Sequence, residues 1–231
     1  MEMINARQRD LSGLKIAGVL FDMDGLVLDT EKLYARFWME AAHFYGFPMT
    51  YEQVLGMRSL NKEAGSRLLR TYFGPTVDYS LVRAKRIELM DAHVAAHGVE
   101  AKPGIGPLLD ILDRYGIPRA IATSSPEDCA RAHLGSLGLE HRFDRILSGH
   151  MVAKGKPEPD IYLYAAAQLG LKPEQCLALE DSPSGIESAW RAGCLPVMIP
   201  DQDQPDEKIR GKLFALAKDL TQVAELIERY G

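Results

Sequence analysis

The sequence has few cysteines, no long apolar run and no excess of positive charge. Cys129, Cys176 and Cys194 are the three cysteines in 231 residues, and no two of them form a CxxC pair. Three cysteines at this spacing are not the pattern of a disulfide-rich domain, and they favour reduced thiols in a cytosol. No apolar segment approaches the roughly 20 residues that cross a bilayer, and a net charge of −5 does not favour nucleic-acid or anionic-membrane binding. The sequence therefore predicts a cytoplasmic globular protein with no membrane and no nucleic acid as partner, and a monomer as the default state.

The hydrophobic fraction, 46%, is ordinary for a globular chain. After residue 103, short apolar runs alternate with segments of helical periodicity, which predicts a parallel sheet with helices on both faces. The expected strands are residues 15–21, 118–122, 145–147, 176–179 and 195–199, and the expected helices are 105–115, 126–137, 159–169, 185–192 and 220–230. Residues 201–208 are expected to form a polar surface loop. The predicted fold class is α/β, with a doubly wound (Rossmann-like) parallel sheet.

Residues 31–102 interrupt this alternation. Apolar residues recur there at helical spacing, as at Leu33 and Phe37, and turns containing glycine and proline punctuate the segment. No strand pattern occurs in it, so we expect an inserted small helical domain of three to five helices. The predicted organisation is a core of residues 1–30 and 103–231 and a helical domain of residues 31–102.

Two carboxylates follow the first predicted strand. Asp22 and Asp24 lie two residues apart, and Gly25 gives the chain the freedom to turn. Because adjacent carboxylates repel, a divalent cation would stabilise the arrangement. One carboxylate could then attack an electrophile while the other transfers protons. The alternative is a structural turn in which an aspartate caps the strand end.

A cluster of hydroxyls, Thr123, Ser124 and Ser125, follows the predicted strand 118–122. Hydroxyl and backbone N–H groups at a strand end can hold phosphate oxygens. Ser125 precedes Pro126 and two acidic residues, so it could instead cap the next helix. The two interpretations are compatible.

Two further clusters carry charge. Lys154 and Lys156 precede a proline-rich turn, and a lysine near the first aspartates would offset their charge and hold a phosphate. The lysines do not form a P-loop, because Pro157 stands where that motif has serine or threonine. Glu180 and Asp181 follow the predicted strand 176–179 and offer the oxygen ligands that Mg²⁺ prefers. Helix capping by Asp181 or the next serine is the alternative.

The segment Asp22-Met23-Asp24-Gly25-Leu26-Val27-Leu28-Asp29-Thr30-Glu31 resembles the first motif of the haloacid dehalogenase (HAD) superfamily. The resemblance is greatest to the group that contains β-phosphoglucomutase and the small sugar-phosphate phosphatases, and the other three clusters stand in the family's order. It implies that Asp22 is a nucleophile that forms an aspartyl-phosphate and that Asp24 is the general acid and base. The second aspartate is absent from the dehalogenase branch, so its presence indicates phosphate chemistry.

The resemblance also assigns binding residues. Lys156 is preferred to Lys154, because the family's lysine directly precedes the proline. The implied phosphate-binding residues are Thr123, Ser124 and Lys156. The implied cofactor is Mg²⁺, held by Asp22, the Asp24 carbonyl, Asp181 and Glu180, the last either directly or through water.

The implied function is Mg²⁺-dependent hydrolysis of a small phosphorylated metabolite, a phosphomonoester of the sugar-phosphate type. The helical insert corresponds to the family's cap domain, and Glu31, Tyr34 and Arg58 are candidate substrate contacts in it, although Arg58 also fits a solvated helix end. The mutase branch has histidine at the position of Tyr34, which favours hydrolysis over a phosphosugar mutase. A receiver-like signalling module ranks lower still, because it needs no such insert.

Overall fold

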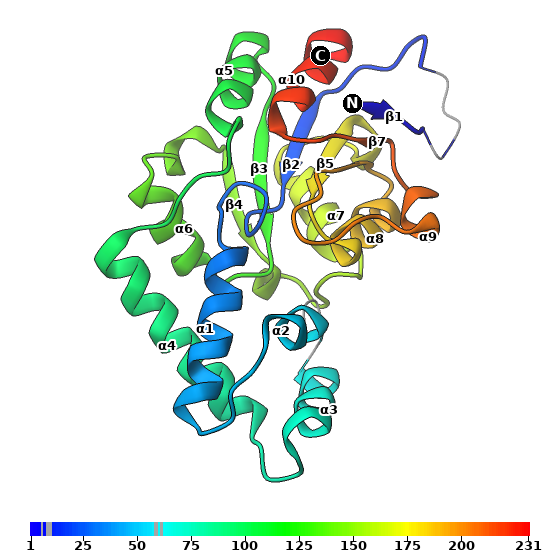
Figure 1. The fold of residues 1–231 in the computed structure, drawn as a ribbon. Helices are drawn as coiled ribbons and strands as arrows, with labels where there is room; N and C mark the ends of the chain where they lie inside the picture. Colours follow the sequence, from blue (N-terminus) through cyan, green and yellow to red (C-terminus); the bar gives the residue numbers. More distant parts are fainter. Residues whose placement is uncertain (6, 8–10, 58–59, 61) are drawn as a thin grey trace. The chain divides into compact units, whose positions relative to one another are not determined.

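The computed structural model describes residues 1–5, 7, 11–57, 60 and 62–231. These residues form two compact units, one of Met1–Asp29 with Glu100–Gly231 and the other of Thr30–Val99. The first is an α/β unit and the second is helical (Figure 1). Among the described residues, no helix combines the length and the apolar character that crossing a bilayer requires.

The described part of the α/β unit contains a seven-stranded sheet in the order β1-β7-β6-β5-β2-β3-β4. In chain order the strands are β1 (Glu2–Met3), β2 (Gly18–Phe21), β3 (Arg119–Thr123), β4 (Arg145–Ser148), β5 (Cys176–Glu180), β6 (Leu195–Met198) and β7 (Ala215–Leu216). β1 pairs antiparallel with β7, and the neighbouring pairs from β7 to β4 are parallel. The chain runs outward from β2 to β4, returns to β5 on the other side of β2, and runs outward again. In a doubly wound sheet, ligands bind where the strand order reverses, here between β2 and β5.

The prediction of a doubly wound α/β fold is confirmed. β2, β3, β5 and β6 are buried along their whole length, as expected for parallel strands covered on both faces. The first strand begins at Gly18, three residues after its predicted start. Two strands of two residues each, β1 and β7, were not predicted.

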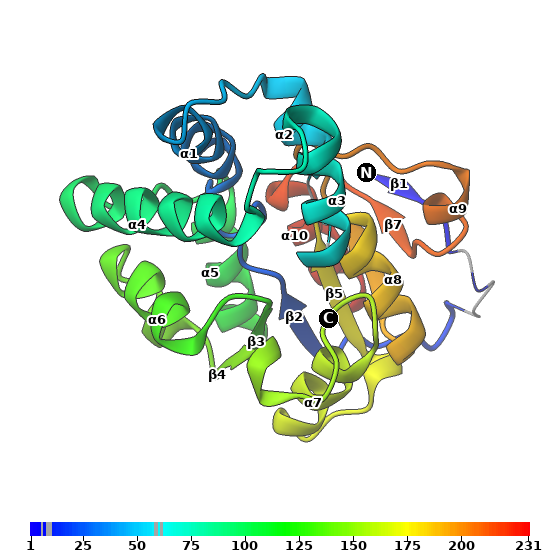
Figure 2. The same ribbon diagram turned by 90° about the horizontal axis from the view of Figure 1, so that it is seen from below.

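Helices cover both faces of the sheet. In chain order they are α5 (Ile105–Tyr115), α6 (Glu127–Ser136), α7 (Asp160–Gln168), α8 (Pro183–Ala192), α9 (Glu207–Arg210) and α10 (Leu220–Tyr230), with short 3₁₀ helices at Glu140–Arg142, Gly149–Met151 and Pro173–Gln175. Residues of α7 and α8 pack on one face of the central strands, around Leu20 and Ala178. α5 and α10 pack together on the opposite face (Figure 2). The short helix α9 begins inside the predicted loop 201–208, so that part of the prediction is wrong.

The start of α8 follows from local chemistry. The Ser182 hydroxyl accepts a hydrogen bond from the Gly185 N–H at 3.1 Å, and Pro183 occupies the first helical position. Both features stabilise a helix N-terminus, because the first N–H groups have no partner within the helix. The helix therefore begins two residues before its predicted start.

The helical unit contains four helices among its described residues, a number within the predicted range. They are α1 (Glu31–Phe44), α2 (Tyr51–Met57), α3 (Lys62–Phe73) and α4 (Tyr79–His97). α1 packs against α4, and a cluster that includes Ala41, Leu69 and Val82 forms the centre of the unit. Asp78 caps α4 by accepting the N–H groups of Ser80 and Leu81.

The chain leaves and re-enters the α/β unit along two paired segments. The Asp29 N–H donates to the Glu100 carbonyl and the Lys102 N–H donates to the Val27 carbonyl, each at 2.8 Å. Lys102 Nζ also forms ion pairs with Asp29 at 3.2 Å and with Asp201 at 2.9 Å. The two segments are therefore joined to each other and to the loop after β6.

Candidate active site

A tight loop at the end of β2 positions the first two aspartates. The Asp22 N–H donates to the Leu179 carbonyl of β5 at 3.0 Å, which continues the pairing of the two strands. Gly25 then adopts a φ of +86°, a conformation that favours glycine, and its N–H donates to the Leu28 carbonyl at 2.9 Å. The turn separates the two side chains, so that Asp22 is buried and Asp24 is only partly buried.

Asp22, Glu180 and Asp181 form a buried acidic cluster. Each offers a carboxylate oxygen, and the three oxygens lie within 4.8 Å of one another. They come together because β2 and β5 are neighbours and their carboxyl ends meet at the same edge of the sheet. Three buried carboxylates at this spacing could hold a hard divalent cation.

Lys156 is the cation that contacts this cluster. Its Nζ donates to Asp22 Oδ1 at 2.5 Å and to Glu180 Oε1 at 2.6 Å, and the side chain is only 7% exposed. Lys154 is exposed, and its backbone N–H donates to Asp160. Of the two lysines considered in the sequence, the structure thus brings Lys156 to Asp22.

The electrostatics of the cluster are dominated by burial. Burial raises the pKa of Asp22 to about 8. The positive charge of Lys156 acts to lower this pKa, and the negative charge of Glu180 acts to raise it. Burial acts to lower the pKa of Lys156, but the negative charges of Asp22 and Glu180 outweigh it, so this pKa is raised. The lysine therefore stays positively charged, whereas burial favours the protonated form of Asp22.

The hydroxyl cluster lies at the end of β3, which pairs with β2. Thr123 is buried, and its Oγ1 accepts the Ser125 N–H at 3.0 Å, whereas Ser124 is exposed. Ser125 Oγ donates to Asp24 Oδ2 at 2.7 Å, and Ser148 Oγ of β4 donates to the Ser125 carbonyl at 2.7 Å. The cluster thus connects directly to the loop after β2.

The alternative interpretation of Ser125, as the cap of the next helix, is not what the structure shows. The N-cap residue of α6 is Pro126, and no side chain caps this helix. The Ser125 hydroxyl contacts a carboxylate from the β2 loop instead, about 100 residues earlier in the chain. No local pattern could have indicated this partner, because Ser-Pro-Glu-Asp is also a good helix start.

Two residues around Glu180 were also missed by sequence reasoning. The Tyr162 hydroxyl donates to Glu180 Oε1 at 2.5 Å, and Ser182 Oγ donates to Glu180 Oε2 at 3.2 Å. The sequence indicates only a capping role for Ser182, and the residue has that role as well. For Tyr162, six residues after Lys156, the sequence offers only a weak signal, because Tyr164 in the same helix also carries a hydroxyl.

The remaining predicted residues belong to the helical unit. Glu31 is the first residue of α1 and is partly buried. Tyr34 packs beside Leu33 and Phe37, and the Arg86 guanidinium lies over its ring, 4.7 Å from the centroid. Arg58 lies outside the described residues.

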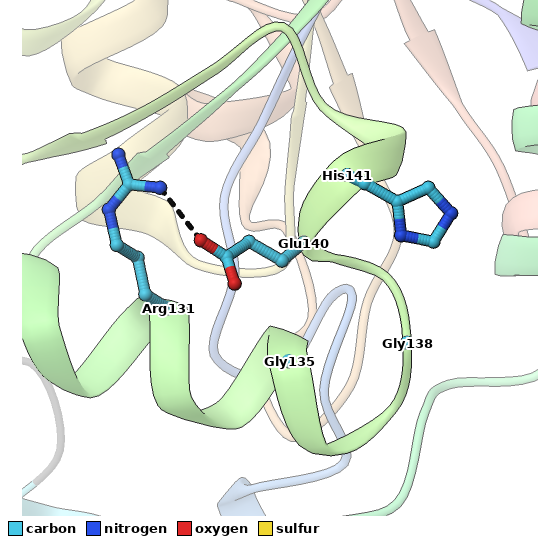
Figure 3. Close-up of a pocket in the computed structure, with 5 residues that line it drawn as sticks. All are labelled: Arg131, Gly135, Gly138, Glu140 and His141. Carbon is cyan, nitrogen blue, oxygen red and sulfur yellow. Dashed lines mark hydrogen bonds and ion pairs between the residues drawn. The ribbon is translucent and has the colours of Figure 1, made fainter.

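A separate surface hollow of about 400 Å³ lies between α6 and the 3₁₀ helix at Glu140–Arg142 (Figure 3). Its lining residues are Arg131, Gly135, Gly138, Glu140 and His141. The one cation that points across it, Arg131, forms an ion pair with Glu140 at 2.9 Å. The hollow includes none of the clustered carboxylates, so the acidic cluster remains the candidate active site.

Comparisons with known proteins identify the family of the chain. Residues 16–193 match a family of hydrolases described as haloacid dehalogenase-like hydrolases. A phosphorylated carbohydrates phosphatase of Thermotoga maritima is 34% identical over 176 residues, which cover 76% of this chain and 81% of that protein. Hexitol phosphatase A of Escherichia coli is 35% identical over 186 residues, which cover 80% of this chain and 84% of that protein.

Solved structures give the same result for the fold. A variant of CbbY from Rhodobacter sphaeroides, crystallised with xylulose-(1,5)bisphosphate, is 30% identical with a TM-score of 0.74. The similarity covers 90% of this chain and 96% of that one. Both units of the chain therefore fall within the region shared with such proteins.

Proposed function

The chain belongs to the haloacid dehalogenase-like hydrolase family, and we propose that it is a phosphatase that hydrolyses a small phosphorylated sugar or sugar alcohol. The observation that carries this proposal is the buried contact of Asp22 with Lys156 beside Glu180 and Asp181. A carboxylate held by a lysine at a strand end is suited to attack an electrophile that carries negative charge, such as a phosphoryl group.

The two aspartates after β2 have different roles in the reaction. Asp22 attacks phosphorus in line, so that a bond from its carboxylate oxygen to phosphorus forms while the ester bond breaks. Asp24 gives its proton to the leaving alcohol and then takes a proton from the water that hydrolyses the aspartyl-phosphate. The Ser125 hydroxyl orients Asp24 for both transfers.

The phosphoryl group is bound by groups that surround Asp22. Lys156 offsets its negative charge, and the hydroxyl and N–H groups of Thr123 and Ser124 hold its oxygens at the end of β3. Positioning and charge stabilisation supply most of the rate increase in phosphoryl transfer.

The donor set of the cluster fits a divalent cation. Three buried carboxylates lie within 4.8 Å of one another, and burial, with a smaller contribution from the charge of Glu180, raises the pKa of Asp22, so a bound cation would stabilise its ionised form. We propose Mg²⁺, held by the carboxylates of Asp22 and Asp181 and the Asp24 carbonyl, with Glu180 beside it. The bound cation supplies positive charge that offsets the phosphoryl oxygens and keeps Asp22 ionised.

The substrate class is inferred from the relatives. One is named for phosphorylated carbohydrates and another for hexitol phosphates, and the CbbY structure holds a sugar bisphosphate. We propose the same class, a phosphorylated sugar or sugar alcohol, as the substrate of this chain, with Glu31, Tyr34 and Arg58 of the helical unit as candidate contacts.

Substitution of the proposed nucleophile tests this function. In a phosphate-release assay over sugar phosphates with Mg²⁺, we expect Asp22→Asn to lose more than about 10³-fold of the activity while its circular dichroism spectrum stays that of a folded protein. Asp110→Asn, which alters an exposed aspartate paired with Arg142, should retain activity within twofold. Near-normal turnover by Asp22→Asn would exclude Asp22 as the nucleophile. Conversion of a sugar phosphate to its isomer by the wild type, without phosphate release, would indicate a mutase.

A further inference from the structure

Glu180 is a completely buried carboxylate, and both of its oxygens accept hydrogen bonds. Oε1 accepts hydrogen bonds from Lys156 Nζ at 2.6 Å and from the Tyr162 hydroxyl at 2.5 Å. A carboxylate is buried at high cost unless such donors satisfy it. One oxygen of Glu180 therefore joins the lysine of the site to a tyrosine from the core.

Tyr162 is fixed by its surroundings. Its side chain is fully buried in the cluster of α7, α8 and the central strands. Lys156 Nζ lies over its ring at 5.2 Å from the centroid, within the range of cation–π attraction. The tyrosine thus contacts both Glu180, through its hydroxyl, and Lys156, through its ring.

The start of α8 also lies against the Glu180 carboxylate. Ser182 Oγ donates to Glu180 Oε2 at 3.2 Å. A Cβ atom at Gly185 would lie 1.9–2.0 Å from the carboxylate atoms of Glu180, so the carboxylate lies directly against the glycine backbone. In this position the Glu180 Oε1 atom contacts both Tyr162 and Lys156.

We propose that Tyr162 is a positioning residue for phosphoryl transfer, which acts through Glu180 to hold Lys156 Nζ against Asp22. This inference rests on the proposed function. Without the tyrosine hydroxyl, Glu180 loses one of two donors on Oε1 and can follow the flexible lysine side chain. The ammonium group would then be displaced from the place where negative charge accumulates in the transition state.

The test compares two tyrosines on one helix. We expect Tyr162→Phe to lower kcat/KM for p-nitrophenyl phosphate about tenfold and to raise the Kd of orthovanadate, a mimic of the transferring phosphoryl group, by a similar factor. Tyr164→Phe removes a hydroxyl from a partly buried tyrosine that packs against the same cluster, and it should change both values less than twofold. Equal effects of the two substitutions, or no effect of Tyr162→Phe, would overturn the proposal.

A double-mutant cycle tests whether Tyr162 acts through the lysine. In a Lys156→Met background, Tyr162→Phe should change kcat/KM less than twofold, because no ammonium group remains to be positioned. An additive tenfold loss would show that the tyrosine has a merely structural effect.

A binding measurement separates the lysine from the metal. Mg²⁺ alone should still raise the melting temperature of Tyr162→Phe, because Asp22 and Asp181 keep their carboxylates, and complete loss of this increase would show that the substitution disrupts the metal site instead of displacing Lys156. If the wild type binds orthovanadate but releases no phosphate from any ester, the proposed function fails. The change in orthovanadate affinity in Tyr162→Phe still decides the role of Tyr162 in that case.

Discussion

At the scale of single residues, Gly185 leaves the space that the Glu180 carboxylate occupies. A Cβ atom there would lie 1.9–2.0 Å from that carboxylate, far inside contact distance. We expect Gly185→Ala to lower the free energy of unfolding by about 1–3 kcal/mol, as overpacking does, and to lower kcat/KM because Glu180 is displaced. Urea unfolding and phosphate release measure the two effects.

Gly106 provides the matched control. It also lies in the first turn of a helix, α5, but outside that helix's own nearby backbone no atom of the described residues lies within 4 Å of its Cβ position. Gly106→Ala should leave activity unchanged and raise the free energy of unfolding by about 0.5–1 kcal/mol, since alanine restricts the unfolded chain. A Gly185→Ala protein as stable and active as the wild type would show that Glu180 has room to move.

Residues of the site differ in how far the sequence could predict them. The carboxylates at the ends of β2 and β5 follow from topology, since parallel strands bring their carboxyl ends to one edge. The contacts of Ser125 with Asp24 and of Tyr162 with Glu180 could not be predicted. Each depends on the side-chain geometry of residues that are distant in sequence or on different elements, which no local periodicity encodes.

At the scale of elements, the paired segments around Asp29 and Lys102 are held by both backbone and side chains. Lys102 Nζ joins Asp29 to Asp201, and its pKa is raised: burial opposes this, and the hydrogen bonds and charges of the two aspartates outweigh burial. We expect Lys102→Met to lower the free energy of unfolding by about 1 kcal/mol. Urea denaturation measures this change.

An exposed ion pair serves as the comparison for Lys102. Glu40→Gln removes the Arg36–Glu40 pair on the surface of α1, and such pairs contribute only about 0.3–0.5 kcal/mol. If the two substitutions destabilise the protein equally, Lys102 has no special role in joining the two segments.

The elements that the sequence failed to predict are the shortest ones. β1 and β7 have two residues each, too few for an alternating pattern, and β1 pairs with a partner more than 200 residues away. α9 has four residues and begins after Asp206, which accepts the Ile209 N–H at 2.8 Å as its N-cap. Long elements such as α5 and α10 were predicted closely, because their apolar faces repeat over three turns.

At the scale of the whole molecule, stability depends on pH through Asp22 when metal is removed. Burial raises the pKa of this group from 3.8 to about 8. Between these values the folded protein keeps a proton that the unfolded chain has released, so the stability present at low pH is lost as the pH rises toward 8. Lys156 is protonated throughout this range, so it does not contribute to the pH dependence of the free energy of unfolding. In a chelator, the free energy of unfolding should therefore fall between pH 5.5 and about 8.

Mg²⁺ should reverse this loss, because a cation that binds the folded state alone stabilises it. At a concentration about 100 times its Kd, the gain is about 2.7 kcal/mol. In Asp22→Asn, the free energy of unfolding in chelator should not fall between pH 5.5 and about 8, and Mg²⁺ should increase it by less than in the wild type. A slope that persists in Asp22→Asn would assign the titration to another group.

The pairing of the segments around Asp29 and Glu100 has a consequence for protein engineering. The backbones of Asp29 and Glu100 are hydrogen-bonded neighbours, and Leu28 and Ala101 pair antiparallel like the last residues of a hairpin. A short glycine-containing turn could connect them in place of residues 30–99 without altering the course of any strand of the sheet. The α/β unit is thus a scaffold with one exchange point, at which different helical inserts could be joined to the same set of carboxylates.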